Sequence, residues 1–270
     1  MSLNGIASSA LTALRTNSAA LAVVSNNVAN INTEGYARRV VQQQTLAPGG
    51  QLMGVDIASV QRVVDRFLQQ ESLSAGAGSA QYGAQASLFA QLNSILGGPG
   101  DKQSLATRLT DLQKAFAIAG QAPTAPASYT AILSALTGMA DQVADVSKTI
   151  TTLQVQIDGQ IASSVSEVNS LLQQIFSLNT QIKNANAAGN TNSGLADQRD
   201  TALQALAGKM DIRITQQPDG GLIVATTDGV NLVSNTYAQL SYTPGAQNGV
   251  YGNVKIQDVN PTTGALIGTP

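Results

Sequence analysis

A single apolar stripe along residues 3 to 31 is the feature that most constrains how this chain can fold. Apolar or small side chains recur there at alternating intervals of three and four residues, the heptad spacing of a coiled-coil seam. The seam consists of Leu3, Ala7, Ala10, Leu14, Leu21, Val24, Val28 and Ile31. So narrow and alanine-rich a stripe cannot form a core by itself. The sequence therefore predicts one helix over residues 3 to 29 that needs a partner helix.

The composition excludes several classes of function. The 270 residues contain no Cys and no His, which excludes disulfides, Cys nucleophiles, His general bases and zinc sites built from these residues. Net charge is −2, so we expect neither a nucleic-acid nor a membrane partner. No apolar run approaches the ~18 residues of a transmembrane helix. The N-terminus also lacks the pattern of a cleavable signal peptide.

A second heptad stripe, over residues 129 to 187, predicts a long helix that no Pro interrupts. At ~1.5 Å per residue such a helix is a rod of roughly 85 Å. The alternative is two helices of a compact bundle joined by a turn near Gly159. Before this stripe, the pattern predicts an extended connector with one hairpin, a helix that begins near Ser59, and a further helix with Asp101 as its N-cap.

After Asp211 the pattern changes to the alternation typical of β-strands. Short alternating segments at 212–215, 222–226 and 231–233 are separated by turns that contain Asp219-Gly220-Gly221 and Asp228-Gly229. Helices followed by hairpins predict a mainly α fold with a β-rich C-terminal part. We expect an elongated helical coiled coil or bundle, followed by a β-hairpin domain.

The sequence offers no catalytic, cofactor-binding or metal site. Phosphate-binding loops, nucleophile elbows and calcium loops are all missing from the sequence. The one dense polar cluster consists of Leu195, Asp197, Gln198, Arg199 and Asp200. Its paired carboxylates could hold a cation. They more simply complement the dipole at a helix N-terminus, with Arg199 pairing with one of them. We therefore expect no enzyme activity and no cofactor.

Residues 26 to 38 resemble the N-terminal signature of the bacterial flagellar rod, hook and hook-associated proteins. In that family, Asn-Asn-x-Ala-Asn-x-Asn-Thr-x-Gly-Tyr follows a heptad helix. The matching positions here are Asn27, Ala29, Asn30, Asn32, Thr33, Gly35, Tyr36 and Arg38. A second motif, residues 195 to 200 followed by Leu203, Leu206 and the β segments, is similar to hook-associated members found where hook and filament meet.

This resemblance implies a division of the chain into domains. Residues 1–34 would form an inner coiled-coil domain, 35–58 a connector, and 59–208 a helical middle domain. Residues 209–270 would begin an outer β domain that this chain leaves incomplete. The family closes with a C-terminal helix that pairs with the N-terminal one. Because no such helix is present here, we expect residues 3 to 31 to be disordered alone or held by neighbouring subunits.

The resemblance also implies a structural role, as a subunit of the junction zone on which the filament assembles. Implied partners are further copies in a ring-like zone, the hook protein, a second junction protein, flagellin, the flagellar export apparatus and an export chaperone. The location would be the extracellular flagellum, reached through its channel without a cleaved signal. The alternatives are another axial protein of hook or rod, or an unrelated secreted coiled-coil scaffold or adhesin.

Overall fold

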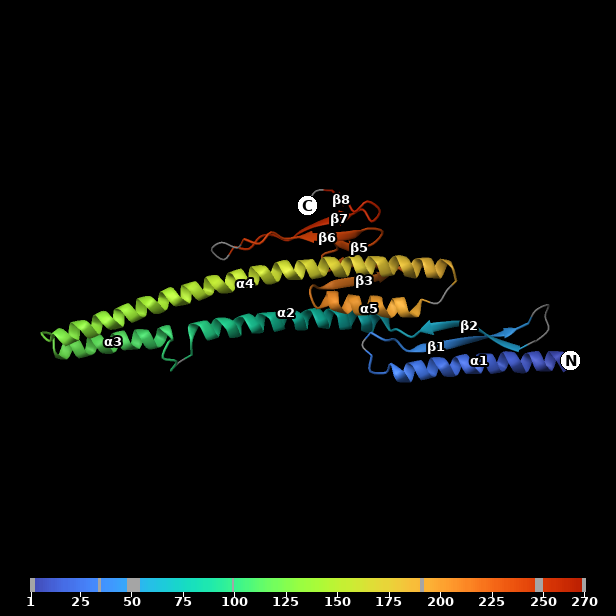
Figure 1. The fold of residues 1–270 in the computed structure, drawn as a ribbon, viewed down its shortest axis with the longest axis horizontal. Coiled ribbons are helices and arrows are strands. Elements are labelled where there is room, and N and C mark those ends of the chain that lie inside the picture. The colour runs from blue at the N-terminus through green and yellow to red at the C-terminus, as the bar shows by residue number, and fades with distance from the viewer. Residues whose placement is uncertain are drawn as a thin grey trace. The chain divides into compact units, whose positions relative to one another are not determined.

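The computed structural model describes residues 3–33, 35–47, 54–98, 100–189, 192–245 and 250–268. Helices dominate the chain up to residue 207, interrupted by one hairpin between the first two helices, and a sheet follows (Figure 1), which confirms the predicted fold class. The helices are α1 (Leu3–Ala29), α2 (Arg66–Leu96), α3 (Leu105–Gln121), α4 (Pro126–Ala187) and α5 (Ser193–Ala207). The strands are β1 (Arg39–Leu46), β2 (Gly54–Arg62), β3 (Ile212–Gln216), β4 (Leu222–Thr226), β5 (Asn231–Val233), β6 (Tyr237–Ser241), β7 (Lys255–Val259) and β8 (Leu266–Ile267).

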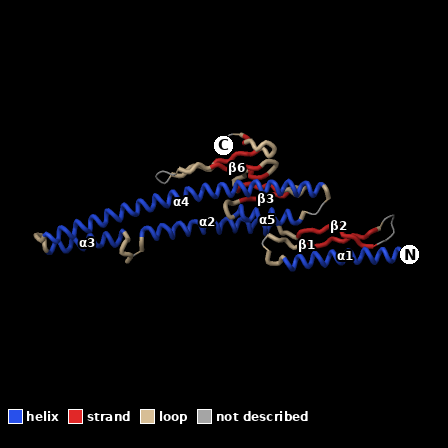
Figure 2. The backbone as a smooth tube through the Cα atoms, viewed as in Figure 1, coloured by secondary structure: helices blue, strands red, loops and turns tan. Residues whose placement is uncertain are grey.

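Helix α1 has the bounds that the seam predicted, and it packs against the antiparallel hairpin of β1 and β2. Figure 2 shows the hairpin running alongside the helix. Ser9 and Thr12 of the helix lie next to Gly54 of the hairpin, and the buried Thr16 donates from Oγ1 to the carbonyl oxygen of Val55 at 3.1 Å. The hairpin begins within the predicted connector (residues 35–58) but extends past it to Arg62, and residues 48–53 are outside the described part. This support for α1 was not anticipated from the sequence.

Helix α4 is continuous over 62 residues, which confirms the predicted long helix. The alternative of a turn near Gly159 is therefore wrong. Gly159 lies in the helix with no foreign atom within 4 Å of where a Cβ would be. An isolated Gly inside a helix lowers stability by only ~1 kcal/mol relative to Ala, which the apolar stripe of a helix this long outweighs.

Two predicted helix starts are wrong by a few residues. Ser59 lies in β2, because Val55 to Arg62 pair with β1, and α2 begins only at Arg66. The N-cap of α3 is Ser104, whose Oγ accepts from the backbone N–H of Thr107 at 3.1 Å. Asp101 instead closes the preceding turn, where its carboxylate accepts from the N–H of Gln103 at 3.0 Å.

The chain forms two compact units. One contains residues 1–78, 167–240 and 256–270, and the other contains 79–166 and 241–255. In the first, the end of α4 and helix α5 bury apolar side chains with strands of the six-stranded sheet, whose order is β3-β4-β5-β6-β7-β8. This core consists of Leu172, Ile175, Leu178, Ile182, Leu203, Leu206, Ile212, Val224, Leu232, Val233 and Leu240.

Amide side chains on helices hold strands of the first unit by their backbones. On α4, Asn179 donates to the carbonyl of Leu222 at 2.8 Å and accepts from its N–H at 3.1 Å. Asn169 does the same with Leu240, at 2.8 and 2.7 Å. Gln70 of α2 bonds β3 in the same way. We call these contacts amide clamps. Each satisfies one strand donor and one strand acceptor with an uncharged group.

We expect Asn179→Ala to lower the stability of the first unit more than an Asn→Ala change at any exposed position of α4 does. Asn179 is 2% exposed, so truncation leaves the N–H and C=O of Leu222 without their partner in the interior. An unsatisfied buried polar group costs about 1–3 kcal/mol. Amide hydrogen exchange of β4 measures the loss, with the exposed Asn184→Ala as control. Equal protection of β4 in both variants would contradict this prediction.

Candidate assembly site

The two sequence motifs meet at one place in the first unit, where the loop after α1 reaches helix α5. Gly35 has φ +77°, a left-handed conformation that favours glycine. A Cβ at Gly35 would lie 2.2 Å from Oγ1 of Thr201. The backbone of the first motif therefore touches α5 at a distance that only glycine allows.

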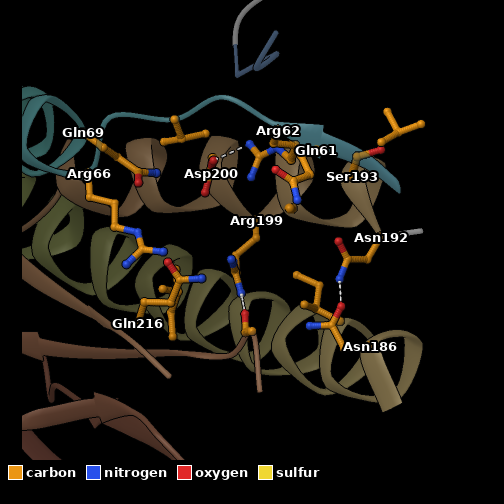
Figure 3. Close-up of a pocket in the computed structure, with 16 residues that line it drawn as sticks. Gln61, Arg62, Arg66, Gln69, Asn186, Asn192, Ser193, Arg199, Asp200 and Gln216 are labelled. Atoms are coloured by element: carbon orange, nitrogen blue, oxygen red, sulfur yellow. Dashed lines mark hydrogen bonds and ion pairs between the residues drawn. The ribbon is translucent and has the colours of Figure 1, made fainter. Parts of the chain in front are cut away.

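Four charged side chains form the centre of this contact, which we call the motif junction. Arg39 donates from Nη2 to Asp197 at 2.7 Å, and Arg62 donates from Nε to the same carboxylate at 2.8 Å. Arg62 also reaches Asp200 with Nη2 at 2.6 Å, as the dashed line in Figure 3 shows. These side chains are only 12–21% exposed. Partial burial makes each charge depend on its partners, because losing one leaves the others poorly solvated.

An amide clamp fixes the geometry of the junction from the side of α1. Asn27 donates to the carbonyl of Arg39 at 2.8 Å and accepts from its N–H at 2.9 Å. The hydroxyl of Tyr36 donates to the same Asn27 oxygen at 2.9 Å. The guanidinium of Arg39 lies over the Tyr36 ring, 5.0 Å from its centroid, in a cation–π contact. Asn27 thus connects the end of α1 to the first strand.

Arg199 hydrogen-bonds to neither carboxylate of its own motif, which corrects the predicted pairing. Adjacent helix residues point about 100° apart, so Arg199 faces away from Asp197 and Asp200. Its Nη1 donates to Asn179 Oδ1 and to the Gly220 carbonyl, both at 2.9 Å. Burial lowers the pKa of Arg199 to about 10, with Asp200 raising it and Arg62 lowering it further. Arg199 therefore remains charged at neutral pH.

The other motif residues lie outside the charged centre of the motif junction. Asn30 donates to the carbonyl of Asn26 at 2.9 Å and accepts from Thr33 at 3.2 Å, which closes the turn after α1. Leu195 is half-buried. Exposed are Ala29, Asn32, Thr33, Arg38 and Gln198.

Three residues of the junction were missed by sequence reasoning: Arg39, Arg62 and Thr201. The signal that could have found the first two is the hairpin register, because Arg39 and Arg62 are directly paired across β1 and β2. Two facing arginines repel one another unless carboxylates lie nearby. The basic pair and the acidic pair of the second motif are thus complementary.

The seam of α1 lies on a face turned away from the hairpin. Its apolar side chains are mostly exposed: Leu14 64%, Leu21 71%, Val24 55%, Val28 67% and Ile31 78%. Ala7 and Ala10 are exposed as well, and the side chain of Leu3 is outside the described residues. Burying one such Leu or Val completely is worth about 1.5–3 kcal/mol. A continuous exposed stripe of this kind marks a surface for another helix.

We expect Gly35→Ala to loosen the motif junction by more than its backbone cost alone. A non-glycine residue in the left-handed region costs about 1–2 kcal/mol, and the clash with Thr201 adds to it. Gly189→Ala is the matched control, because Gly189 has φ +69° and nothing within 4 Å of its Cβ position. Amide exchange over residues 36–46 reports the difference. Thr201→Ala in the Gly35→Ala background should recover part of the loss, and no recovery would contradict the clash.

The described residues contain neither a metal-binding cluster nor a membrane-spanning helix. In the described part of the chain, no three His, Cys, Asp or Glu side chains gather where they could hold a metal ion. No helix within the described ranges is both long and apolar enough to cross a membrane.

Known proteins resemble the chain in two separate regions. Residues 89–269 match the family model of the flagellar hook-associated protein FlgK helical domain. Residues 8–36, which hold most of the seam and the first motif, match the model of the flagella basal body rod protein.

Full-length relatives extend the likeness over most of the chain. Flagellar hook-associated protein 1 of Escherichia coli (strain K12) is 26% identical over 284 residues, which is 98% of this chain and 52% of that protein. The protein of the same name from Bacillus subtilis (strain 168) is 28% identical over 229 residues, 80% of this chain and 45% of that protein. This chain therefore spans about half the length of the curated relatives it matches.

The fold is also found in a solved structure. The flagellar hook junction protein FlgK from Burkholderia pseudomallei superposes with a TM-score of 0.61 at 22% identity, over 74% of this chain and 34% of that one.

Proposed function

Since this chain belongs to the family of the flagellar hook-associated protein FlgK, we propose that it is a structural subunit of the bacterial flagellum. Its place is the junction zone between hook and filament, and its role is to let the filament assemble on the hook. The work it performs is packing rather than catalysis. No cofactor enters this proposal.

The exposed seam of α1 is the observation that carries the proposal. The helix has one face against β1 and β2, while Leu14, Leu21 and Val28 are each more than 60% exposed on another face. One face of α1 thus contacts its own hairpin, and the other is free to contact a neighbouring subunit. The exposed seam contributes to stability only when a second helix covers it. The seam residues named above are therefore the proposed assembly contacts.

The motif junction transmits this contact to the rest of the unit. Asp197 holds both Arg39 of β1 and Arg62 of β2, and the loop at Gly35 lies directly on α5. Force on α1 therefore reaches α5 through an ionic and steric contact rather than through a flexible linker. A division into coiled-coil, connector, helical and outer β domains, with limits near residues 34, 58 and 208, belongs to the same proposal.

The proposed partners are further copies of the subunit, the hook protein, a second junction protein and flagellin. Export would follow the flagellar channel, with the export apparatus and a chaperone, to an extracellular location. The alternative is that the chain is a subunit of the flagellar rod or hook. The match of residues 8–36 to the rod protein model supports this alternative.

Deletion of the gene in its source bacterium tests the proposal. Electron microscopy should find bare hooks, and an assay of the medium should find secreted flagellin monomers. Missing hooks would move the subunit to rod or hook. Intact filaments would overturn a flagellar role and favour an unrelated secreted scaffold. Complementation with the intact gene is the control for effects on neighbouring genes.

A further inference from the structure

A polar pocket of about 380 Å³ lies beside the motif junction in the first unit (Figure 3). Its walls come from the end of β2, the start of α2, the ends of α4 and β3, the first turns of α5 and the turn before β4. Three guanidinium groups and a single carboxylate line it: Arg62, Arg66, Arg199 and Asp200. The pocket therefore contains more positive than negative charge.

Two of these three cations, Arg66 and Arg199, make no ion pair with a carboxylate in the described part of the chain. Arg62 already pairs with Asp197 and Asp200. Arg199, only 5% exposed, hydrogen-bonds through Nη1 to two neutral oxygens, and its Nε has no acceptor among the described residues. Arg66 is exposed and has neither an ion pair nor a side-chain hydrogen bond in the described part of the chain. The pocket thus brings together a buried cation, Arg199, and an exposed one, Arg66.

The N-terminal end of α5 lies beside the same pocket. Asn192 and Ser193, at the start of the 15-residue helix α5, line the pocket. The side chain of Asn192 makes no cap hydrogen bond to α5 and bonds to Asn186 instead. The first N–H groups of α5 therefore donate no hydrogen bond to the Asn192 side chain, and this end of the helix carries a partial positive charge. Amides of Gln61, Gln69 and Gln216 add neutral donors around it.

We propose that this pocket binds an oxyanion, a phosphate or carboxylate group. Arg66 and Arg199 supply the charge, and the first turn of α5 supplies backbone donors, as at other anion-binding helix N-termini. The oxyanion can be a free ion or an acidic side chain of another subunit in the assembly. Binding of a free ion stands on the pocket alone, whereas an acidic side chain from another subunit rests on the proposed function.

Titration of the purified chain with sodium phosphate and with sodium acetate tests the proposal, with sodium chloride at equal ionic strength as reference. Chemical shifts of the Ser193 and Gly194 amides and the thermal midpoint are followed together. We expect saturable shifts at these amides with phosphate and a rise in the midpoint that chloride does not produce. Equal effects of chloride, or no saturable shift with either oxyanion, would overturn the proposal.

The variant Arg66→Gln removes one cation without disturbing the core, because Arg66 is exposed. A charge-assisted hydrogen bond is worth about 1.5–3 kcal/mol, so binding should weaken about tenfold or more. Arg213→Gln is the matched control, since Arg213 is exposed and does not line the pocket. Unchanged phosphate binding in Arg66→Gln, or an equal loss in Arg213→Gln, would contradict the site.

Cells that carry Arg66→Gln distinguish the two possible sources of the oxyanion. If Arg66→Gln abolishes phosphate binding but its cells assemble normal filaments, the pocket serves a free ion. If its cells also shed flagellin, the pocket receives an acidic side chain from a neighbouring subunit. A wild-type chain that binds phosphate while gene deletion leaves filaments intact would uphold the pocket and overturn only the flagellar role.

Discussion

Cells that carry Ala10→Asp or Leu14→Asp are expected to secrete flagellin into the medium and to lack filaments. Both positions lie on the exposed seam of α1. An Asp there would be buried when a partner helix covers the seam, and burying an unpaired charge costs several kcal/mol. The isolated chain should lose little stability, because neither side chain is buried in it.

Ala22→Asp is the control, because it makes the same chemical change on the same helix. Ala22 is exposed and lies about 120° around the helix from the middle of the seam, away from the hairpin as well. Its cells should form normal filaments. Electron microscopy and the flagellin assay compare the variants, and circular dichroism checks that each purified chain retains its helices. Normal filaments in cells that carry Ala10→Asp would contradict the role of the seam as an assembly contact.

Asp197→Ala should be the most destabilising single change at the motif junction. It leaves Arg39 and Arg62 partly buried without the carboxylate that both contact, although Asp200 remains with Arg62. Removing one partner of a buried ion pair costs roughly 3–5 kcal/mol, and the residual exposure here places the loss near the lower end. Amide exchange over residues 36–46 should rise accordingly, because β1 is held to α5 through Arg39.

The exposed Asp211→Ala serves as the control in the same unit. It should leave exchange of β1 unchanged, since an exposed charge contributes little to stability. The double variant Arg62→Ala with Asp197→Ala should lose less free energy of unfolding than the sum of the losses in the two single variants. Both changes remove the same interaction, so its loss is counted only once. Full additivity would show that the cluster contributes through independent contacts instead.

Periodicity and turn chemistry predicted most of the fold correctly. The family was also predicted correctly, from residues 26–38 and 195–200. The predicted helix end at Ala29 is correct, because Asn30 follows at once and Asn32 and Gly35 come soon after, and the Asp228-Gly229 turn separates β4 from β5. Helix starts were less accurate: Asp101 and Ser104 are both good N-caps, and only the turn geometry selects Ser104.

Contacts between distant residues could not be predicted. The partner of Asp197 on β1 is 158 positions away in the sequence, and the partner of Gln70 on β3 is 142 away. Nothing local distinguishes the buried Asn179 from the exposed Asn184 on the same helix, because an amide looks like a surface residue in either setting. Only the packing of the sheet on α4 decides which amide is buried.

The amide clamps determine which substitutions the strands and the helix can each tolerate. Asn169 and Asn179 hold Leu240 and Leu222 through groups that every residue except proline possesses. Replacing either leucine with another apolar residue of similar volume would leave its clamp intact. The strand positions are therefore constrained by the core alone. The attachment itself depends on a single helix position each time, and there even the exchange of Asn for Asp removes the donor.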